Sequence, residues 1–132
     1  MKTWLTAGLA GVLVLGCAND GTDPTVEVPA VPTGISAKIE SGNLVLTWDD
    51  VPGATSYNVY MAAEVGVKRA NYTSLQANMF HPGEHAGKFD HPPGLNPDMK
   101  YYLVVTAVNE AGESAESCEV GAIVSTALGE SC

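Results

Sequence analysis

Hydrophobic and polar positions alternate most clearly between residues 101 and 108 of this 132-residue chain. One set of alternate positions holds Tyr101, Leu103, Val105 and Ala107, and the other holds Tyr102, Val104, Thr106 and Val108. A period of two sends successive side chains to opposite faces of a β-strand. We therefore predict a strand whose first set faces a core and whose second set faces outward.

Shorter alternating stretches predict strands at residues 35–39, 44–48, 57–61 and 118–124. In the third of these, Tyr57, Val59 and Met61 are expected inside, with Asn58 and Tyr60 outside. Alternation breaks down across residues 62–91, where Pro82 and Gly83 interrupt it. We expect one or two edge strands in that segment, one of them at residues 88–91, and the pattern assigns no register to them. Residues 126–132 are expected to form a short tail.

Several of these residues carry a resemblance to a known family. Leu95 and Pro97 ahead of Tyr101 resemble the tyrosine corner of fibronectin type III domains, in which a Tyr hydroxyl bonds to the backbone near the preceding turn. The stretch WDDVPGATSYNVY, beginning at Trp48, resembles two strands of that family and the loop between them. The resemblance implies a seven-stranded antiparallel β-sandwich of the immunoglobulin-like class over residues 32–125. It also implies a structural core containing Trp48, Tyr57, Leu95 and Tyr101.

The first 17 residues resemble a bacterial lipoprotein signal peptide. A positive Lys2 precedes an apolar run of about a dozen residues, too short to span a membrane, and small residues lead to Cys17. The resemblance implies cleavage of residues 1–16 and attachment of fatty acyl chains such as palmitate to Cys17. The alternative is an ordinary secretory signal in which Cys17 has no special role. If Cys17 is lipidated, residues 17–31 would form a flexible acidic tether. Ala18, where a lipoprotein retained in the inner membrane would usually have Asp, favours the bacterial outer membrane.

Charge narrows the range of partners. The formal net charge is −9, and loss of the leader, whose one charged side chain is Lys2, makes it −10. Such a surface repels nucleic acid and anionic lipid headgroups, so membrane attachment is expected through acyl chains alone.

Three histidines lie within eleven positions, at His81, His85 and His91. Imidazole is a suitable ligand for zinc or copper. Their spacing is not diagnostic, because Pro82 and Gly83 oppose the helix that would place His81 and His85 on one face. We therefore predict a solvated loop with no metal and no other cofactor. The chain also lacks a nucleophile grouped with a histidine and a carboxylate, so we predict that it is not an enzyme.

Cys118 and Cys132 remain once Cys17 is lipidated. In an oxidising compartment three states are open for this pair: an intramolecular disulfide, two free thiols, or a bridge to a partner through the terminal Cys132.

Candidate binding residues fall in two groups. Tyr72 and Phe80, with Tyr60 and Tyr102, could form an exposed aromatic patch of the kind that marks contact sites, although half-exposed aromatic side chains also stabilise sheets. The second group, Asn109, Glu110 and Gly112, directly follows the strand at 101–108. The loops at residues 49–56 and 79–88 are further candidates for ligand contact. We expect a protein partner at the cell envelope; a glycan or cell-wall ligand and a passive spacer are the alternatives.

Overall fold

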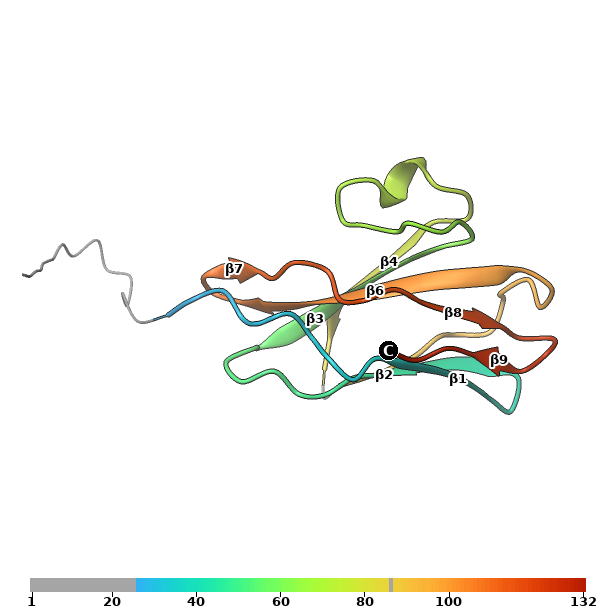
Figure 1. The fold of residues 1–132 in the computed structure, drawn as a ribbon, viewed down its shortest axis with the longest axis horizontal. Helices are drawn as coiled ribbons and strands as arrows, with labels where there is room; N and C mark the ends of the chain where they lie inside the picture. The colour runs from blue at the N-terminus through green and yellow to red at the C-terminus, as the bar shows by residue number, and fades with distance from the viewer. Residues whose placement is uncertain (1–25, 86) are drawn as a thin grey trace, which may run out of the picture.

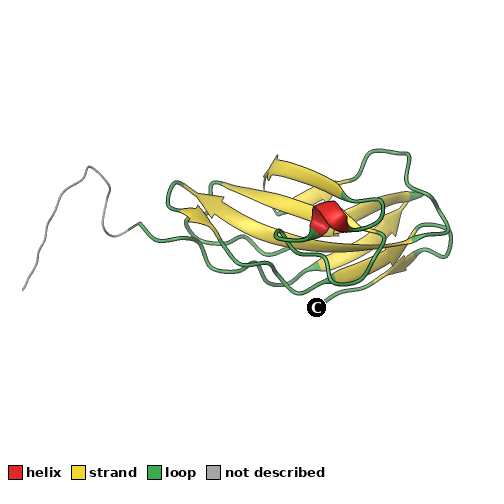
Figure 2. Ribbon diagram, turned by 90° about the horizontal axis from the view of Figure 1, so that it is seen from above, coloured by secondary structure: helices red, strands yellow, loops and turns green. Residues whose placement is uncertain are grey.

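The computed structural model describes residues 26–85 and 87–132. The predicted leader, Cys17 and most of the predicted tether lie outside the described residues. Strands account for nearly all the regular structure, and they form two packed antiparallel layers (Figures 1 and 2). No helix in the described part of the chain is long and apolar enough to cross a membrane.

The smaller layer is a three-stranded sheet in the order β1-β2-β5, made of β1 (Ser36–Glu40), β2 (Asn43–Thr47) and β5 (Lys88–Asp90). The larger layer runs β4-β3-β6-β8-β9, with β7 paired to β6. Its strands are β3 (Ser56–Ala62), β4 (Met79–Glu84), β6 (Lys100–Asn109), β7 (Gly112–Glu113), β8 (Val120–Ile123) and β9 (Leu128–Gly129). A single 3-10 turn, η1 (Tyr72–Ser74), lies in the loop between β3 and β4.

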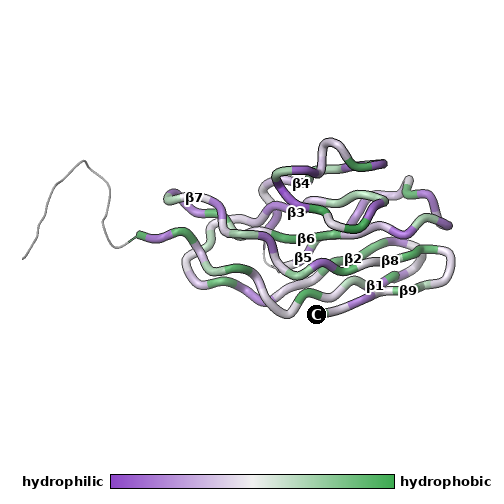
Figure 3. Tube along the Cα trace, turned by 45° about the horizontal axis from the view of Figure 1, so that its top comes forward, coloured by the Kyte–Doolittle hydropathy of each residue, from purple (hydrophilic) through white to green (hydrophobic). Residues whose placement is uncertain are grey.

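The core lies between the two layers and consists of the side chains predicted to face inward. Leu46, Val59 and Leu103 are fully buried there, and Figure 3 shows the hydrophobic stretches along β6 and β8. Trp48 packs edge-on against Tyr57 with ring centroids 5.2 Å apart. The Tyr57 hydroxyl accepts a hydrogen bond from the backbone N–H of Val51 at 2.9 Å, so this buried polar group is satisfied.

The tyrosine corner has the geometry that the resemblance implies. The Tyr101 hydroxyl accepts a hydrogen bond from the backbone N–H of Asn96 at 3.0 Å. Leu95 and Met99 pack against the main core on either side of this bond. The corner therefore fixes the approach of the chain to β6, the strand with the most neighbours in the larger sheet.

The outward set of β6 is not exposed, which corrects the prediction for that face. Val104 and Thr106 are 2% and 0% exposed, and Tyr60 on the adjacent β3 is 3% exposed. The cause is the β3–β4 loop (residues 63–78), which lies across this face and contributes Val67 and Tyr72 to a second apolar cluster. Figure 1 shows the loop on the far side of β3 and β6 from the smaller sheet. The fold is thus a sandwich with a partial third layer.

The C-terminal residues form structure where a tail was predicted. β9 pairs with β8, and beyond it the Ala37 backbone N–H donates to the carbonyl of Glu130 at 2.8 Å, which joins the segment to β1. A Cβ at Gly129 would lie 2.1 Å from the Ala37 carbonyl oxygen, so this close approach requires glycine. Cys118 and Cys132 form a disulfide, and the tail therefore closes one open edge of the sandwich.

Candidate functional site

Three aromatic rings gather where β3, β4 and the β3–β4 loop meet; we call them the aromatic face (Tyr60, Tyr72 and Phe80). Phe80 stacks on Tyr60 with centroids 4.9 Å apart, and Tyr72 packs edge-on against Tyr60 at 5.1 Å. The rings differ in accessibility, since Tyr60 is buried, Tyr72 is half-buried and Phe80 is 41% exposed. The aromatic face therefore exposes one large apolar side chain, Phe80, which packs on the rings of Tyr60 and Tyr72.

Phe80 also lies on a sheet edge. Within the described part of the chain, β4 pairs with β3 on one side and has no strand on the other. An edge strand offers backbone N–H and C=O groups that can pair with another polypeptide. Pro82, in the same strand, removes one donor and limits the length of such pairing. At this edge another polypeptide could pair with the backbone of β4 and also contact the apolar ring of Phe80.

Three glutamates spaced three residues apart fasten the β3–β4 loop to the sheet; we call them the acidic latch (Glu113, Glu116 and Glu119). Glu119 accepts hydrogen bonds from the backbone N–H groups of Gly66 and Val67 at 2.8 and 2.7 Å. Glu116 accepts one from the backbone N–H of Arg69 at 2.8 Å. Charged acceptors make stronger bonds than neutral ones, so the loop carrying Tyr72 is held in one position.

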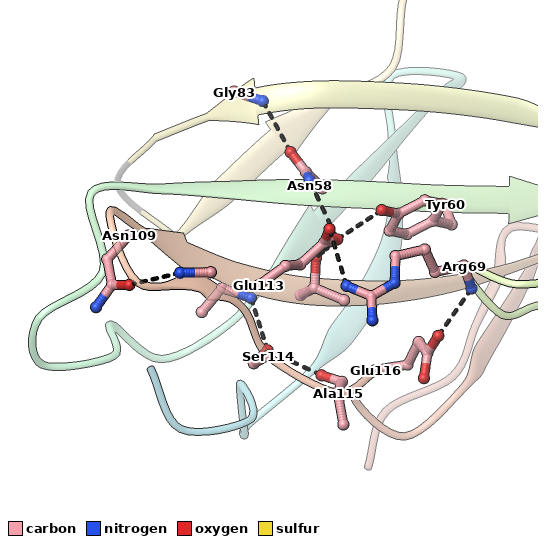
Figure 4. Close-up of polar contacts among 12 residues, drawn as sticks. Asn58, Tyr60, Arg69, Gly83, Asn109, Glu113, Ser114, Ala115 and Glu116 are labelled. Atoms are coloured by element: carbon pink, nitrogen blue, oxygen red, sulfur yellow. Dashed lines mark hydrogen bonds and ion pairs between the residues drawn. The ribbon is translucent and has the colours of Figure 1, made fainter. Parts of the chain in front are cut away.

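Glu113 is the most heavily bonded member of the latch, as Figure 4 shows. One of its carboxylate oxygens accepts hydrogen bonds from the hydroxyls of Tyr60 and Thr106, both at 2.5 Å, and from the Asn58 amide at 3.1 Å. The other oxygen pairs with the Arg69 guanidinium at 3.0 Å. One carboxylate thus satisfies two buried hydroxyls below it and ties them to the loop above.

This bonding changes the acidity of two groups in the site. Burial acts to raise the pKa of Glu113, but hydrogen bonds donated by Thr106, Tyr60, Asn58 and Arg69 outweigh it and hold that pKa below its usual value. Burial, reinforced by the neighbouring carboxylate, raises the pKa of the Tyr60 hydroxyl above its ordinary value. At neutral pH the carboxyl is therefore ionised and the phenol keeps its proton, as their hydrogen bond requires.

Acid is expected to weaken the contacts that Glu113 makes in the latch. A carboxyl group whose pKa is lower in the folded chain adds stability above its unfolded pKa of about 4.5, and that stability is lost as pH falls through the lower folded value. We expect amide-exchange protection in the β3–β4 loop to drop below about pH 4.5 while protection in β6 persists. A Glu113→Gln variant serves as the control, because it has no carboxyl group to titrate at position 113 and its loop should therefore respond less to acid. An equal acid-induced loss in both proteins would assign the effect to other groups.

The second predicted group lies in the β6–β7 turn, directly before Glu113, and none of its three residues is part of the aromatic face. The Asn109 side chain accepts from the backbone N–H groups of Ala111 and Gly112 and donates to the carbonyl of Glu27. Glu110 is exposed. Residues 26–30, 52–53, 55 and 109–110 line an open groove of about 830 Å³ there. Asn109 and Gly112 therefore shape a turn and fix the entering chain.

The three histidines do not come together. The rings of His81 and His91 are T-shaped to each other, with centroids 5.2 Å apart, whereas His85 is exposed in the following turn. Among the described residues, no three His, Cys, Asp or Glu side chains form a group able to hold a metal ion. A site ligated by all three histidines is therefore ruled out by their placement.

Sequence and structure comparisons define the class of this sandwich. No protein-family model matches the chain. A solved Fn3-like protein from Clostridium thermocellum is 31% identical, with a TM-score of 0.57 over 70% of this chain and 90% of that one. The chain therefore belongs to the fibronectin type III family, whose domains are generally non-catalytic modules, and the predicted immunoglobulin-like sandwich is confirmed.

Two curated proteins contain similar stretches. An amylopullulanase of Thermoanaerobacterium saccharolyticum is 28% identical over 108 residues, which is 82% of this chain. The tail tube protein of Bacillus phage SPP1 is 32% identical over 93 residues, or 70% of this chain. This chain spans 7% and 30% of the lengths of these two relatives, so the similarity concerns one module within each.

Proposed function

We propose that this chain is a non-catalytic accessory module that binds a protein partner at the cell envelope through Phe80 and the adjoining edge of β4. The observation that carries the proposal is the position of Phe80, which is 41% exposed on a strand whose second edge pairs with no other strand among the described residues. A passive spacer has no need of a large apolar side chain on a fixed aromatic base, because such exposed side chains favour association.

Rigidity supports recognition at this face. The acidic latch holds the β3–β4 loop, and the loop holds Tyr72 against the base of Phe80. A surface ordered before binding loses less conformational entropy when a partner docks. The backbone groups of the β4 edge favour a polypeptide as that partner, because they pair with another main chain.

Attachment to the membrane is the second part of the proposal and depends on the leader. A small-residue site ending in Cys17 supports lipidation, and Ala18 supports the outer membrane. Two or more acyl chains give stable anchoring, whereas one chain holds a protein only marginally. The net charge of −10 expected after cleavage would keep the domain away from anionic headgroups.

A glycan ligand is the second candidate, favoured by the similarity to an amylopullulanase, a glycoside hydrolase by name. Phe80 could stack on a sugar ring. The aromatic face supports this less well than a protein partner, because Tyr60 lies beneath Phe80 and offers no ring to solvent. Retention of the protein on purified envelope polysaccharide, lost on Phe80→Ser, would favour the glycan.

Capture from native envelopes tests both parts of the proposal. The intact chain should partition into membranes, and a Cys17→Ser form should not. Both should recover the same protein partner, because the contact surface is in the domain. A Phe80→Ser form should lose at least tenfold in recovered partner, whereas Leu128→Ser, which removes a similarly exposed side chain (39%) from β9, should lose none. Equal recovery by these last two forms would contradict the assigned surface.

A further inference from the structure

Three side chains meet at the second open edge of the sandwich, between β4 and β5; we call them the His–Met cluster (Met79, His81 and His91). Met79 and His81 are in register with Met61 and Val59 of β3, which are fully buried, so they lie on the core side of β4. His91 directly follows β5 and is 8% exposed. The cluster thus connects the two sheets at the edge opposite the disulfide.

The contacts of His91 indicate which of its two ring nitrogens carries the hydrogen. Its Nδ1 lies 2.5 Å from the carbonyl oxygen of Pro92, and because a carbonyl only accepts, Nδ1 carries the hydrogen. In the neutral ring, Nε2 then holds a lone pair, and it faces the Met79 Sδ at 3.2 Å. Two acceptors this close favour a positively charged species, a proton or a metal ion, that both can bind.

His81 brings a second imidazole ring next to that of His91. Its Nε2 is buried and has no hydrogen-bond partner among the described residues. Burial, together with the neighbouring His91, lowers the pKa of His81 below its ordinary value. Two imidazoles bound to one ion through bonds of roughly 2.0 Å have ring centres up to about 6 Å apart. The observed 5.2 Å meets this condition.

We propose that Met79 Sδ, His81 Nε2 and His91 Nε2 bind one soft monovalent cation, of the Cu(I) class. A thioether selects Cu(I), and imidazole is a good copper ligand, whereas calcium and magnesium require oxygen ligands. With bonds of roughly 2.0 Å to nitrogen and 2.3 Å to sulfur, the 3.2 Å contact subtends about a right angle at the ion. Asp90 is not a competing ligand, because its side chain is exposed and paired with Lys88 at 3.6 Å.

Binding would join β4 to the end of β5, as the disulfide joins the tail to the sheet edge on the other side. A ligand that binds the folded chain and not the unfolded chain raises the apparent stability by an amount that grows with the logarithm of the ratio of ligand concentration to dissociation constant. The cation is therefore expected to raise the thermal midpoint of the protein.

The test uses the full chain carrying Cys17→Ser, so that no free thiol competes for the metal. Ag(I), which needs no reductant, is titrated first, and Cu(I) follows in ascorbate against a competing chelator. We expect one equivalent to bind, with simultaneous NMR shifts of the His81 and His91 rings and the Met79 methyl group. Met79→Leu, which preserves side-chain volume and should fold normally, is expected to weaken binding at least tenfold.

His85→Gln is the matched control, since it removes an exposed imidazole close in sequence and should leave affinity unchanged. A His91→Gln variant checks the second ligand, with the thermal midpoint of the metal-free proteins showing that both variants fold. Absence of binding would overturn the proposal. So would binding that survives Met79→Leu and His91→Gln, or that falls equally with His85→Gln.

Discussion

Replacing Glu113 with alanine is expected to lower the free energy of unfolding by about 3 kcal/mol. The substitution leaves the buried hydroxyls of Tyr60 and Thr106 without their acceptor, and each such loss costs roughly 1–3 kcal/mol. It also removes the ion pair with Arg69, whose own contribution is small because the arginine side chain is about half exposed. The loop should detach from β6 as a consequence.

Urea unfolding followed by the fluorescence of buried Trp48 measures this effect. Glu110→Ala is the matched control, because Glu110 is an exposed carboxylate in the same turn and its loss should change stability by less than about 0.5 kcal/mol. Glu113→Gln, which keeps the shape of the side chain, should fall between the two. Equal stabilities for Glu113→Ala and Glu110→Ala would show that the latch does not hold the loop.

Replacing both Cys118 and Cys132 with serine is expected to cost about 3 kcal/mol in the chain-entropy model, because the bridge closes a loop with a sequence separation of 14. The tail should then lose its pairing with β1, because the bridge holds Cys132, whose N–H donates to the carbonyl of Ile35 directly before that strand. Both cysteines are exposed, so a mild reductant should destabilise the native protein by a similar amount. The serine variant should not respond to reductant.

Mass spectrometry after alkylation without reduction provides an independent check on the bridge. The folded domain should show no alkylation at Cys118 or Cys132 before reductant is added and two modified thiols afterwards. Two alkylated thiols in the untreated protein would contradict the bridge, and a dimer mass would indicate a bond between chains.

The sequence predicted the fold best at positions where a structural feature requires one particular residue type. Trp48 and the group of Leu95, Pro97 and Tyr101 gave the class of fold, because the corner hydrogen bond needs a tyrosine at a fixed distance after a turn. Alternation also placed the inward face of β6 correctly, since that face always packs against the opposite sheet. These features depend on local spacing, which a sequence displays directly.

The outward face of β6 was predicted wrongly, and for a physical reason. What covers Val104 and Thr106 is an irregular loop with no periodicity of its own, so alternation in β6 could not reveal it. A signal was present in the unbroken apolar run Leu103, Val104, Val105, because strands buried on both faces lose their alternation.

The acidic latch was missed as well. Glu113, Glu116 and Glu119 recur every third residue, but in sequence such a series is indistinguishable from a solvated acidic surface. Their partners are backbone N–H groups some 50 residues away, which carry no side-chain signature. The C-terminal strand β9 was missed for a similar reason, since its position beside Ala37 depends on a close glycine contact rather than on a pattern.

Site-specific photocrosslinking in native envelopes tests the central claim, recognition of a protein through the aromatic face, most directly. The full chain is expressed with benzoylphenylalanine in place of Phe80, and separately in place of Leu128, which is similarly exposed on β9 at the other end of the larger sheet. We expect a discrete protein adduct from position 80 and none from position 128. The same adducts from both positions, or none from position 80, would contradict it.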